Sequence, residues 1–332
     1  MKKLNNDYVV KRAIKIIKQY NEILNFNLKG YTIFTEVGSN HYLYSPIIPL
    51  LCGADHVFAF IKDTKFGKAA DIKQQCIEIA NFLGLTNKLT IGENNFEYEW
   101  LTKSDIVTNS GMLRPIDKKK LSYFKKGSVI PLMFEAWEFR DSDLDIAECK
   151  KLGIKIAGTW ENHPEIRVFD SVKMLCLKMA FEAGYEIQGN TIFVWSDDHF
   201  GELIVESFNA NGAKKCFLST DKLLLNKVIS QIDFIFFADY DEKENLFNLI
   251  NFKSQTDQNY DFGIVHLFGN INIDIFKELG INIYPDFNGN SEQMTFTLSH
   301  VGLLPILKLQ VAGYRVAYEM LNNQITSISQ PI

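Results

Sequence analysis

The sequence has no long hydrophobic run and no excess of basic charge. No apolar stretch approaches the roughly 18–20 residues that a helix needs to cross a bilayer. Lysine and arginine total 35 against 40 aspartates and glutamates, so the formal net charge is −5. A chain of this charge has no overall positive field that would attract nucleic acid or anionic lipid. We therefore expect neither a nucleic acid nor a membrane as a partner.

Paired-cysteine motifs are also missing. The five cysteines are scattered along the chain and none belongs to a C-x-x-C pair. This spacing indicates neither a zinc site nor a disulfide framework, so we predict reduced thiols and a cytoplasmic protein. The six histidines are dispersed as well, and no metal site is predicted. The first residues lack the apolar segment of a secretion signal. Composition thus favours a cytoplasmic enzyme or small-molecule binding protein.

Short apolar runs alternate with helical patterns along most of the chain, which is typical of α/β proteins with parallel sheets covered on both faces. Strands are predicted at residues 31–37, 56–61, 105–109, 128–134 and 154–159, and again at 191–195, 215–218, 233–238, 263–268 and 281–284. A long helix at 168–183 joins the two sets. The predicted domains are 1–165, 166–300, and a C-terminal segment, 301–332, whose helix we expect to return to the first unit.

In open parallel sheets, ligands bind beyond the carboxyl ends of the strands, so polar residues there are the first candidates. Glu36, Gly38 and Ser39 follow the first predicted strand, and Gly38 would let the backbone pass close to a ligand. Asp63 ends the second strand, where a carboxylate can accept hydrogen bonds from a ribose. The full G-x-G-x-x-G motif is missing, and a turn that simply requires one glycine is the alternative. We predict a cofactor site at these residues.

Two more strand ends carry polar loops. Asn109 begins a loop that contains Arg114, which can orient an anionic group, and we assign Asn109 to the cofactor and Arg114 to the substrate. Glu135, Trp137 and Arg140 follow a strongly apolar strand. That much polarity at a strand end indicates either an ion-paired rim or a site. We interpret Glu135 and Arg140 as catalytic and Trp137 as substrate-binding.

Proton transfer is predicted at two further loops. Glu161 and His163 end the last strand of the first unit and are interpreted as an acid–base pair. Asp198 and His199 follow the first strand of the second unit, where His199 is a candidate proton carrier and Asp198 contacts the substrate. The alternatives are a polar loop at residues 160–164 and an acidic helix start at residues 197–199. A cleft between the two units would bring both histidines to one substrate.

Several segments resemble known families. Residues 104–109, 116–117 and 124–130 look like dinucleotide-binding domains of D-2-hydroxyacid dehydrogenases, and residues 187–194, 200–201 and 211–213 resemble the strand that opens such domains. The resemblance implies two Rossmann-like three-layer units and a nucleotide-type ligand. It does not imply the reaction, because Glu135-Ala136 stands where those enzymes carry Arg-Gly.

The leading functional prediction is an NAD(P)-dependent oxidoreductase acting on a small polar metabolite, with NAD or NADP as cofactor and a homodimer as one possible assembly. Residues 36–39 and 53–59 are equally similar to the opening of S-adenosylmethionine-dependent methyltransferases, which makes a methyltransferase the second candidate. A non-catalytic protein that binds a nucleotide or metabolite is the third. Substrate identity is left open.

Overall fold

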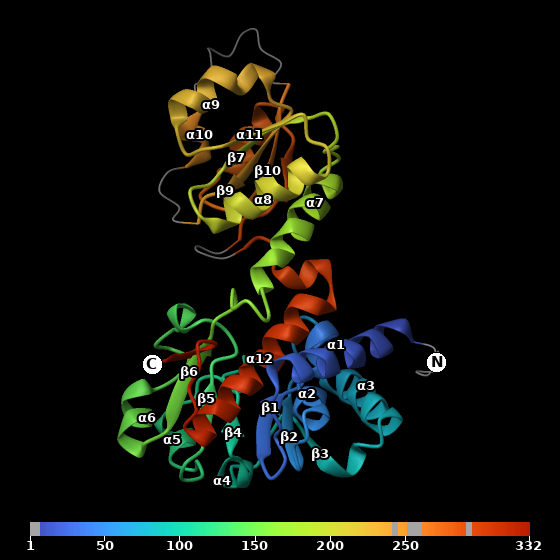
Figure 1. Cartoon of the computed structure of the whole chain (residues 1–332), viewed down its shortest axis with the longest axis vertical. Helices are drawn as coiled ribbons and strands as arrows, with labels where there is room; N and C mark the ends of the chain where they lie inside the picture. The colour runs from blue at the N-terminus through green and yellow to red at the C-terminus, as the bar shows by residue number, and fades with distance from the viewer. Residues whose placement is uncertain (1–6, 241–244, 251–260, 290–293) are drawn as a thin grey trace. The chain divides into compact units, whose positions relative to one another are not determined.

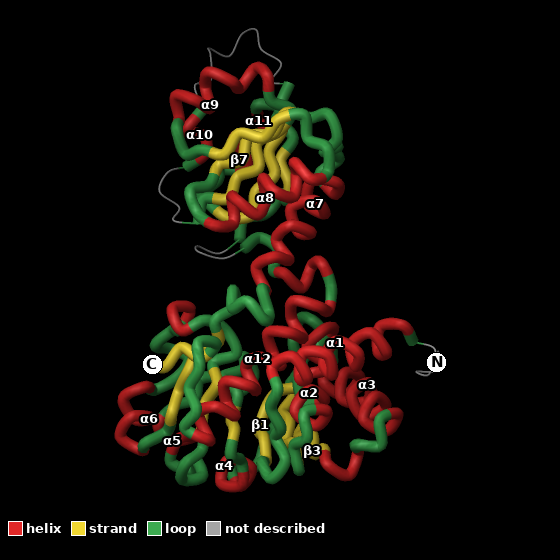
Figure 2. Tube along the Cα trace, in the orientation of Figure 1, coloured by secondary structure: helices red, strands yellow, loops and turns green. Residues whose placement is uncertain are grey.

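The computed structural model describes residues 7–240, 245–250, 261–289 and 294–332. It divides into two compact units, each an α/β layer structure around its own parallel sheet (Figures 1 and 2). Unit 1 comprises residues 1–168 and 302–332, and unit 2 comprises residues 169–301. The predicted fold class, two Rossmann-like units, is confirmed.

The sheet of unit 1 has the order β12-β6-β5-β4-β1-β2-β3. Its strands are β1 (Thr32–Glu36), β2 (His56–Ile61), β3 (Leu89–Glu93), β4 (Ile106–Val107), β5 (Val129–Pro131), β6 (Lys155–Thr159) and β12 (Ser329–Pro331). All pairings are parallel except that of β12 with β6. Without β12, this is the 3-2-1-4-5-6 order of dinucleotide-binding sheets, and the chain reverses direction across the sheet between β1 and β4. Such a reversal leaves a crevice at the carboxyl ends of these two strands.

Helices cover both faces of this sheet. They are α1 (Tyr8–Leu24), α2 (Ile47–Leu51), α3 (Ala69–Phe82), α4 (Glu99–Lys103), α5 (Lys118–Leu121), α6 (Ile146–Leu152) and α12 (Leu303–Asn322), with 3-10 turns η2 (Asn40–Tyr44), η3 (Thr86–Lys88) and η4 (Ala136–Glu138). The amphipathic face of α1 buries Val10, Ala13 and Ile17, and the side chain of Asp7 accepts a hydrogen bond from the backbone N–H of Val9 at its start.

The C-terminal helix α12 belongs to unit 1, although unit 2 separates it from the rest of that unit in the sequence. It packs against α1, β5 and β6 (Figure 1). Arg315 donates hydrogen bonds to the carbonyls of Leu24 and Asn25 at the end of α1, at 2.7 and 2.9 Å. Fully buried Glu319 accepts hydrogen bonds from Arg315 and, beyond the helix, from Ser329 of β12. These contacts fix α12 across the sheet.

Unit 2 has the sheet order β11-β10-β9-β7-β8, all parallel. Its strands are β7 (Thr191–Trp195), β8 (Lys215–Leu218), β9 (Phe234–Ala238), β10 (Gly263–Phe268) and β11 (Ile283–Tyr284). Its helices are α7 (Val172–Glu182), α8 (His199–Ala210), α9 (Lys222–Val228), α10 (Leu246–Leu249) and α11 (Ile273–Glu278), with 3-10 turns η5 (Val168–Ser171), η6 (Ile229–Gln231) and η7 (Leu298–Val301). Every residue of β7, β9 and β10 is buried, as the continuous apolar runs indicate.

Two strands of unit 1 were not predicted from the sequence. β3 lies at the edge of its sheet with half-exposed side chains, and β12 has only three residues, one of them proline. Neither shows the apolar run of a buried strand. Within the described part of the chain, no helix combines the length and the apolar composition needed to cross a membrane.

Candidate ligand pocket in unit 1

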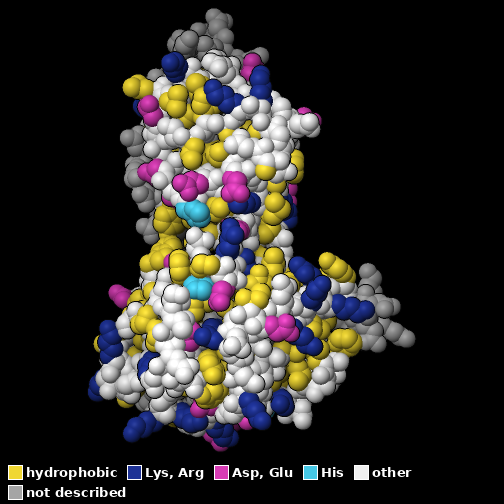
Figure 3. Space-filling view, viewed as in Figure 1, with side chains coloured by type: hydrophobic (Ala, Val, Ile, Leu, Met, Phe, Trp, Pro, Cys, Tyr) yellow, Lys and Arg dark blue, Asp and Glu magenta, His cyan; other side chains and the backbone are white. Residues whose placement is uncertain are grey.

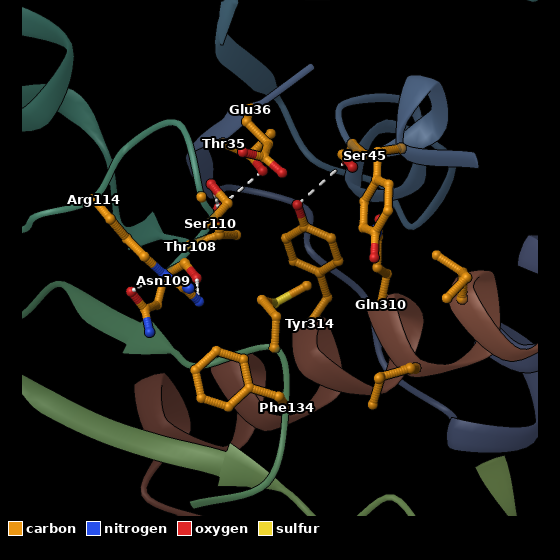
Figure 4. A pocket seen from close by; sticks show the side chains of 15 residues that line it. Thr35, Glu36, Ser45, Thr108, Asn109, Ser110, Arg114, Phe134, Gln310 and Tyr314 are labelled. Carbon is orange, nitrogen blue, oxygen red and sulfur yellow. Dashed lines mark hydrogen bonds between the residues drawn. The ribbon is translucent and has the colours of Figure 1, made fainter. Parts of the chain in front are cut away.

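A pocket of about 330 Å³ opens at the carboxyl ends of β1, β4 and β5, where the sheet order reverses (Figure 4). β1 supplies its last residues, the loops after β4 and β5 supply one wall, and α12 supplies the other. The lining residues are Thr35, Glu36, Tyr42, Ser45, Thr108, Asn109, Ser110, Gly111, Arg114, Met133, Phe134, Ile306, Leu309, Gln310 and Tyr314. Among them Tyr42 and Gly111 are exposed, so they mark its rim.

Hydroxyl groups form the floor of the pocket. Thr108 Oγ1 lies 2.9 Å from Thr35 Oγ1 and 3.2 Å from Ser110 Oγ, which ties the end of β1 to the loop after β4. The hydroxyl of fully buried Tyr314 donates a weak hydrogen bond, 3.4 Å long, to the carbonyl of Ser45. Burial raises the pKa of Tyr314 above its usual value, so its hydroxyl stays protonated.

Glu36 places a carboxyl group at the end of β1. Its Oε2 accepts a hydrogen bond of 2.8 Å from the backbone N–H of Met112. Desolvation raises the pKa of Glu36, and the hydrogen bond and the charge of Arg114 oppose that rise. The carboxyl group can therefore exchange a proton more readily than an exposed glutamate near neutral pH.

Arg114 is held from three sides. Its Nε donates to Asn109 Oδ1 at 3.1 Å, its Nη2 donates to the carbonyl of Asn109 at 2.8 Å, and its Nη1 lies 3.1 Å from Asp143 Oδ2. The guanidinium also lies 5.1 Å above the ring centre of Phe134. Three of its five N–H groups are thus used, and one remains on each Nη. Asp143 balances the positive charge.

Two buried amide groups in the lining have unpaired atoms. Asn109 is 1% exposed and its Nδ2 has no hydrogen-bond partner, and Gln310 is 8% exposed and its Oε1 has none. They lie on different sides of the pocket (Figure 4). An unsatisfied buried polar group costs about 1–3 kcal/mol, so each one in a native structure requires an explanation. A ligand that pairs with both atoms is the explanation that their position favours.

The wall between β5 and α12 contains an unusual backbone conformation. Met133 has a φ of 69°, in the left-handed region that non-glycine residues rarely adopt. Its side chain lies on α12 at Gly313, where an added Cβ would come within 2.6 Å of the Met133 sulfur. Strained conformations of this kind concentrate at functional sites. The thioether consequently forms part of the pocket lining.

A cluster of three glutamates lies beyond β5 and β6. Glu135 Oε1 accepts the backbone N–H of Glu161 at 2.9 Å, and Glu138 Oε1 accepts the backbone N–H of Glu135 at 3.3 Å. Trp137 Nε1 donates to Glu135 Oε2 at 2.7 Å. Burial, and then the charges of the other two carboxyl groups, raise the pKa of Glu161 well above its usual value. Glu161 can therefore carry a proton near neutral pH.

The remaining residues predicted in unit 1 do not line the pocket. Asp63 is exposed, and its Oδ1 accepts the backbone N–H of Ala69 at the start of α3, at 2.8 Å. Gly38 lies against Tyr42, because a Cβ there would be 2.5 Å from the Tyr42 Cβ. His163 Nε2 lies 2.9 Å from Ser327 Oγ. Ser39 precedes η2, and Arg140 follows the glutamate cluster.

The residues predicted in unit 2 form a helix start. Asp198 Oδ1 accepts the backbone N–H groups of Phe200 and Gly201, at 2.9 and 3.2 Å, and a hydrogen bond from Ser196 Oγ at 2.8 Å. Asp198 is thus the N-cap of α8. His199 is half exposed, and its Nδ1 lies 3.3 Å from Glu202 Oε2. Figure 3 shows how charged and apolar side chains are distributed over one face of the molecule.

Sequence reasoning therefore found part of the pocket. It named Glu36, Asn109 and Arg114, which the structure brings together. It missed Gln310 and Tyr314, because both lie on α12, which reaches the pocket only through tertiary packing. Their one local signal is that the apolar helix carries polar side chains on the face it buries.

Comparisons with known proteins add information on the fold. No family model matches the chain, and no curated protein matches its sequence. A dipicolinate synthase component from Bacillus halodurans is similar in structure, with a TM-score of 0.56, 9% identity, and coverage of 90% of this chain and 99% of that one. The corresponding dipicolinate synthase component from Bacillus subtilis has a TM-score of 0.50, 13% identity, and coverage of 90% and 97%.

A pyruvate reductase of Chlamydomonas reinhardtii is similar too, with a TM-score of 0.51, 7% identity, and coverage of 90% of this chain and 99% of that one. At these identities the likeness concerns the fold. The predicted fold of two Rossmann-like α/β units is confirmed at that level.

Proposed function

We propose that the protein is an NAD(P)-dependent oxidoreductase and that the pocket in unit 1 holds its small polar substrate. One observation carries the proposal: buried, unpaired amide atoms line a pocket at the β1/β4 reversal of a sheet with the 3-2-1-4-5-6 order. The volume is at the lower end of the range for small-molecule sites, about 300–1,000 Å³. The fold likeness to a pyruvate reductase supports the reaction class.

The residues near the carboxyl edge of the sheet fit a dinucleotide. Asp63 follows β2 and is exposed, so it can accept hydrogen bonds from a ribose diol while it caps α3. Ser39 follows β1, and Tyr42 lies on the rim of the pocket. We assign Asp63 and Ser39 to the cofactor. Glu36 and Asn109 line the pocket itself, so we now assign them to the substrate.

A nicotinamide cofactor supplies hydride transfer to or from a substrate carbon. The chain must orient that carbon and move one proton. Arg114 and Asn109 can orient the substrate, since Asn109 Nδ2 is unpaired and Arg114 keeps one N–H on each Nη. For the proton, Glu161 in the loop after β6 is one candidate: it does not line the pocket, and burial raises its pKa well above that of an ordinary glutamate. His163 and His199 are further candidates for the proton carrier. In the proposal, Glu135 and Arg140 hold the loop that carries Glu161 and His163 in place.

Cofactor binding tests the proposal directly. Titration with NADH and with NADPH, followed by nicotinamide fluorescence, should give saturable binding. Asp63→Asn keeps an oxygen for the N–H of Ala69 but removes the charge. It should weaken binding at least tenfold, about 1.4 kcal/mol, because charge-assisted hydrogen bonds to a ribose are lost. Asp71→Asn, an exposed acid in the first turn of the same helix, is the matched control and should bind as wild type does.

Two results would contradict the proposal. If S-adenosylmethionine binds and neither nicotinamide cofactor does, the methyltransferase alternative is favoured. If no nucleotide binds at millimolar concentration, a metabolite-binding protein without a nicotinamide cofactor is favoured. Equal binding to wild type and Asp63→Asn would leave the reaction class in place but move the cofactor away from β2.

A further inference from the structure

Besides its hydroxyl groups, the pocket is lined by acceptors and donors that come from different elements. Two hydrogen-bond acceptors line it: Gln310 Oε1 on α12 is unpaired, and the carboxyl group of Glu36 at the end of β1 accepts one hydrogen bond, through Oε2. Donors lie on the β4 side: Asn109 Nδ2 is unpaired, and Arg114 keeps an N–H on each Nη. Figure 4 shows Asn109 and Arg114 together on one side of Tyr314 and Gln310 on the other, with Glu36 beside Thr35 and Ser110.

This arrangement determines which ligand can satisfy the pocket. A group that only accepts hydrogen bonds, such as a carboxylate, suits Asn109 and Arg114 and would meet two acceptors at Glu36 and Gln310. A group that donates, such as a protonated amine, suits Glu36 and Gln310. A ligand with only one of these groups leaves a buried polar atom of the pocket unpaired, which disfavours its binding.

The charges around the pocket also favour a ligand that carries both an acceptor group and a donor group. Asp143 already balances Arg114, at 3.1 Å, and Glu36 adds a further acidic group. The pocket therefore has no excess positive charge to bind a dianion. A ligand with one negative and one positive group matches this balance, because each group faces its opposite.

We propose that the pocket takes a small zwitterion of the amino-acid class, with its carboxylate at Asn109 and Arg114 and its protonated amine at Glu36 and Gln310. The walls next to these groups are apolar and formed by Met133, Phe134, Ile306 and Leu309, so a side chain of modest size and low polarity fits beside them. The proposal rests on the assignment of this pocket to the substrate. It names the class of substrate, which the proposed function leaves open.

A panel of free amino acids tests the substrate class. The twenty standard amino acids are screened at millimolar concentration by the thermal shift of the full-length protein, with and without NADH. For the best ligand, calorimetry then compares the amino acid with its 2-hydroxy acid, which lacks the amine, and with its decarboxylated amine. The amino acid should bind at least tenfold more tightly than either analogue.

Two variants separate the two sides of the pocket. Glu36→Gln keeps an oxygen for the N–H of Met112 and should abolish the preference for the amino acid over the hydroxy acid. Asn109→Asp keeps the oxygen that Arg114 contacts but replaces the donor by an acceptor. It should weaken carboxylate ligands at least tenfold and leave the decarboxylated amine unaffected. Glu22→Gln, an exposed position on α1, is the control and should change neither comparison.

The outcomes distinguish this inference from the proposed function. If NADH or NADPH binds but no amino acid shifts the melting temperature in either condition, the zwitterion is wrong and the oxidoreductase proposal stands. Tighter binding of the hydroxy acid by wild type also overturns the inference. If amino acids bind as described but no nicotinamide cofactor does, the pocket assignment is supported and the oxidoreductase proposal fails.

Discussion

The carboxyl edges of the two sheets use similar polar residues in different ways. In unit 2, Ser196 and Asp198 follow β7. The Ser196 hydroxyl donates a hydrogen bond to Asp198, and Asp198 also accepts backbone N–H groups at the start of α8. In unit 1, Asn109 follows β4 with its oxygen engaged by Arg114 and its Nδ2 unpaired. The first arrangement completes the fold. The second leaves a buried N–H group of Asn109 without a partner, which favours unit 1 as the ligand-binding unit.

The difference teaches that the type of residue at a strand end is a weak guide to its role. An aspartate directly before a helix finds its partners in the backbone amides of that helix, as Asp198 does through Oδ1. Asn109 instead stands before a loop in which the amides of Met112, Leu113 and Arg114 bind other acceptors, and the helix that faces it comes from the other end of the chain. Hydrogen-bond accounting separates the two cases where composition does not.

The largest stability effect is expected at Glu161. A raised pKa means that the native state holds a proton that the unfolded chain releases, so wild-type unit 1 loses stability as the pH rises above about 4.5 and through the native pKa. Glu161→Gln removes the titrating carboxyl group, which at pH 8 costs free energy either to keep its proton or to ionise in a buried site. It should stabilise unit 1 by about 2 kcal/mol at pH 8, with little effect at pH 4. Hydrogen exchange resolved by peptide measures this separately for each unit.

The matched control for this comparison is Glu165→Gln, an exposed position four residues along the same loop. It should leave the stability of unit 1 almost unchanged at both pH values. A gain from Glu161→Gln that is equally large at pH 4 would show that packing, and not the charge, causes it.

Unit 2 should respond to pH in the opposite direction at His266. Burial lowers the pKa of this fully buried imidazole to about 4. The native state therefore binds fewer protons than the unfolded chain, and the stability from neutral His266 is lost as the pH falls from 6.5 through 4. The protection factors of the β10 amides, which correct for the slower intrinsic exchange in acid, should therefore fall on acidification. Unchanged protection of β10 between pH 7 and pH 4.5 would contradict the assignment.

A substitution at Gln310 should stabilise the protein and remove ligand binding together. Gln310→Met keeps the length of the side chain and removes an acceptor that is buried without a partner. The free energy of unfolding should rise by about 1–2 kcal/mol, because the desolvation cost disappears. Affinity for the pocket ligand should fall at least tenfold. A loss of stability would mean that Gln310 is paired in solution, and the case for a ligand at this atom would weaken.

The sequence predicts features that depend on neighbouring residues in the chain, and it does not predict features that depend on tertiary contacts. The alternation of buried runs and helical segments is local, and it placed most strands, while the half-exposed β3 and the short β12 gave no such signal. Glu36, Asn109 and Arg114 were found because strand ends are visible in a sequence. Gln310 was not, since α12 reaches the pocket through contacts of Arg315 and Glu319 with distant segments.

Removal of the helix cap in unit 2 tests the other half of the comparison, that Asp198 stabilises the fold and does not bind the ligand. Asp198→Ala removes the acceptor for the N–H groups of Phe200 and Gly201 and should destabilise unit 2 by about 1 kcal/mol. Ligand affinity of the unit 1 pocket should be unchanged. Asp198→Asn, which keeps the cap oxygen, is the control and should recover most of the lost stability. If Asp198→Ala weakens ligand binding instead, the two strand ends do not differ as proposed.

The smallest change in the free energy of unfolding is expected for His199. The same substitution also tests the difference between the two units most directly. Its ring is half exposed and its Nδ1 faces an exposed glutamate, Glu202, so His199→Asn should change stability by less than about 0.5 kcal/mol. If His199 carries the proton, as the sequence predicts, turnover of the folded enzyme should still fall by about 10²–10⁴. Glu202→Gln is the matched control, because it removes the ion pair and leaves the imidazole in place. A fall in turnover for His199→Asn alone would give the edge of unit 2 a chemical role beside its structural one. Wild-type turnover in both variants would leave proton transfer to Glu161 and His163, and the division between the two units would hold.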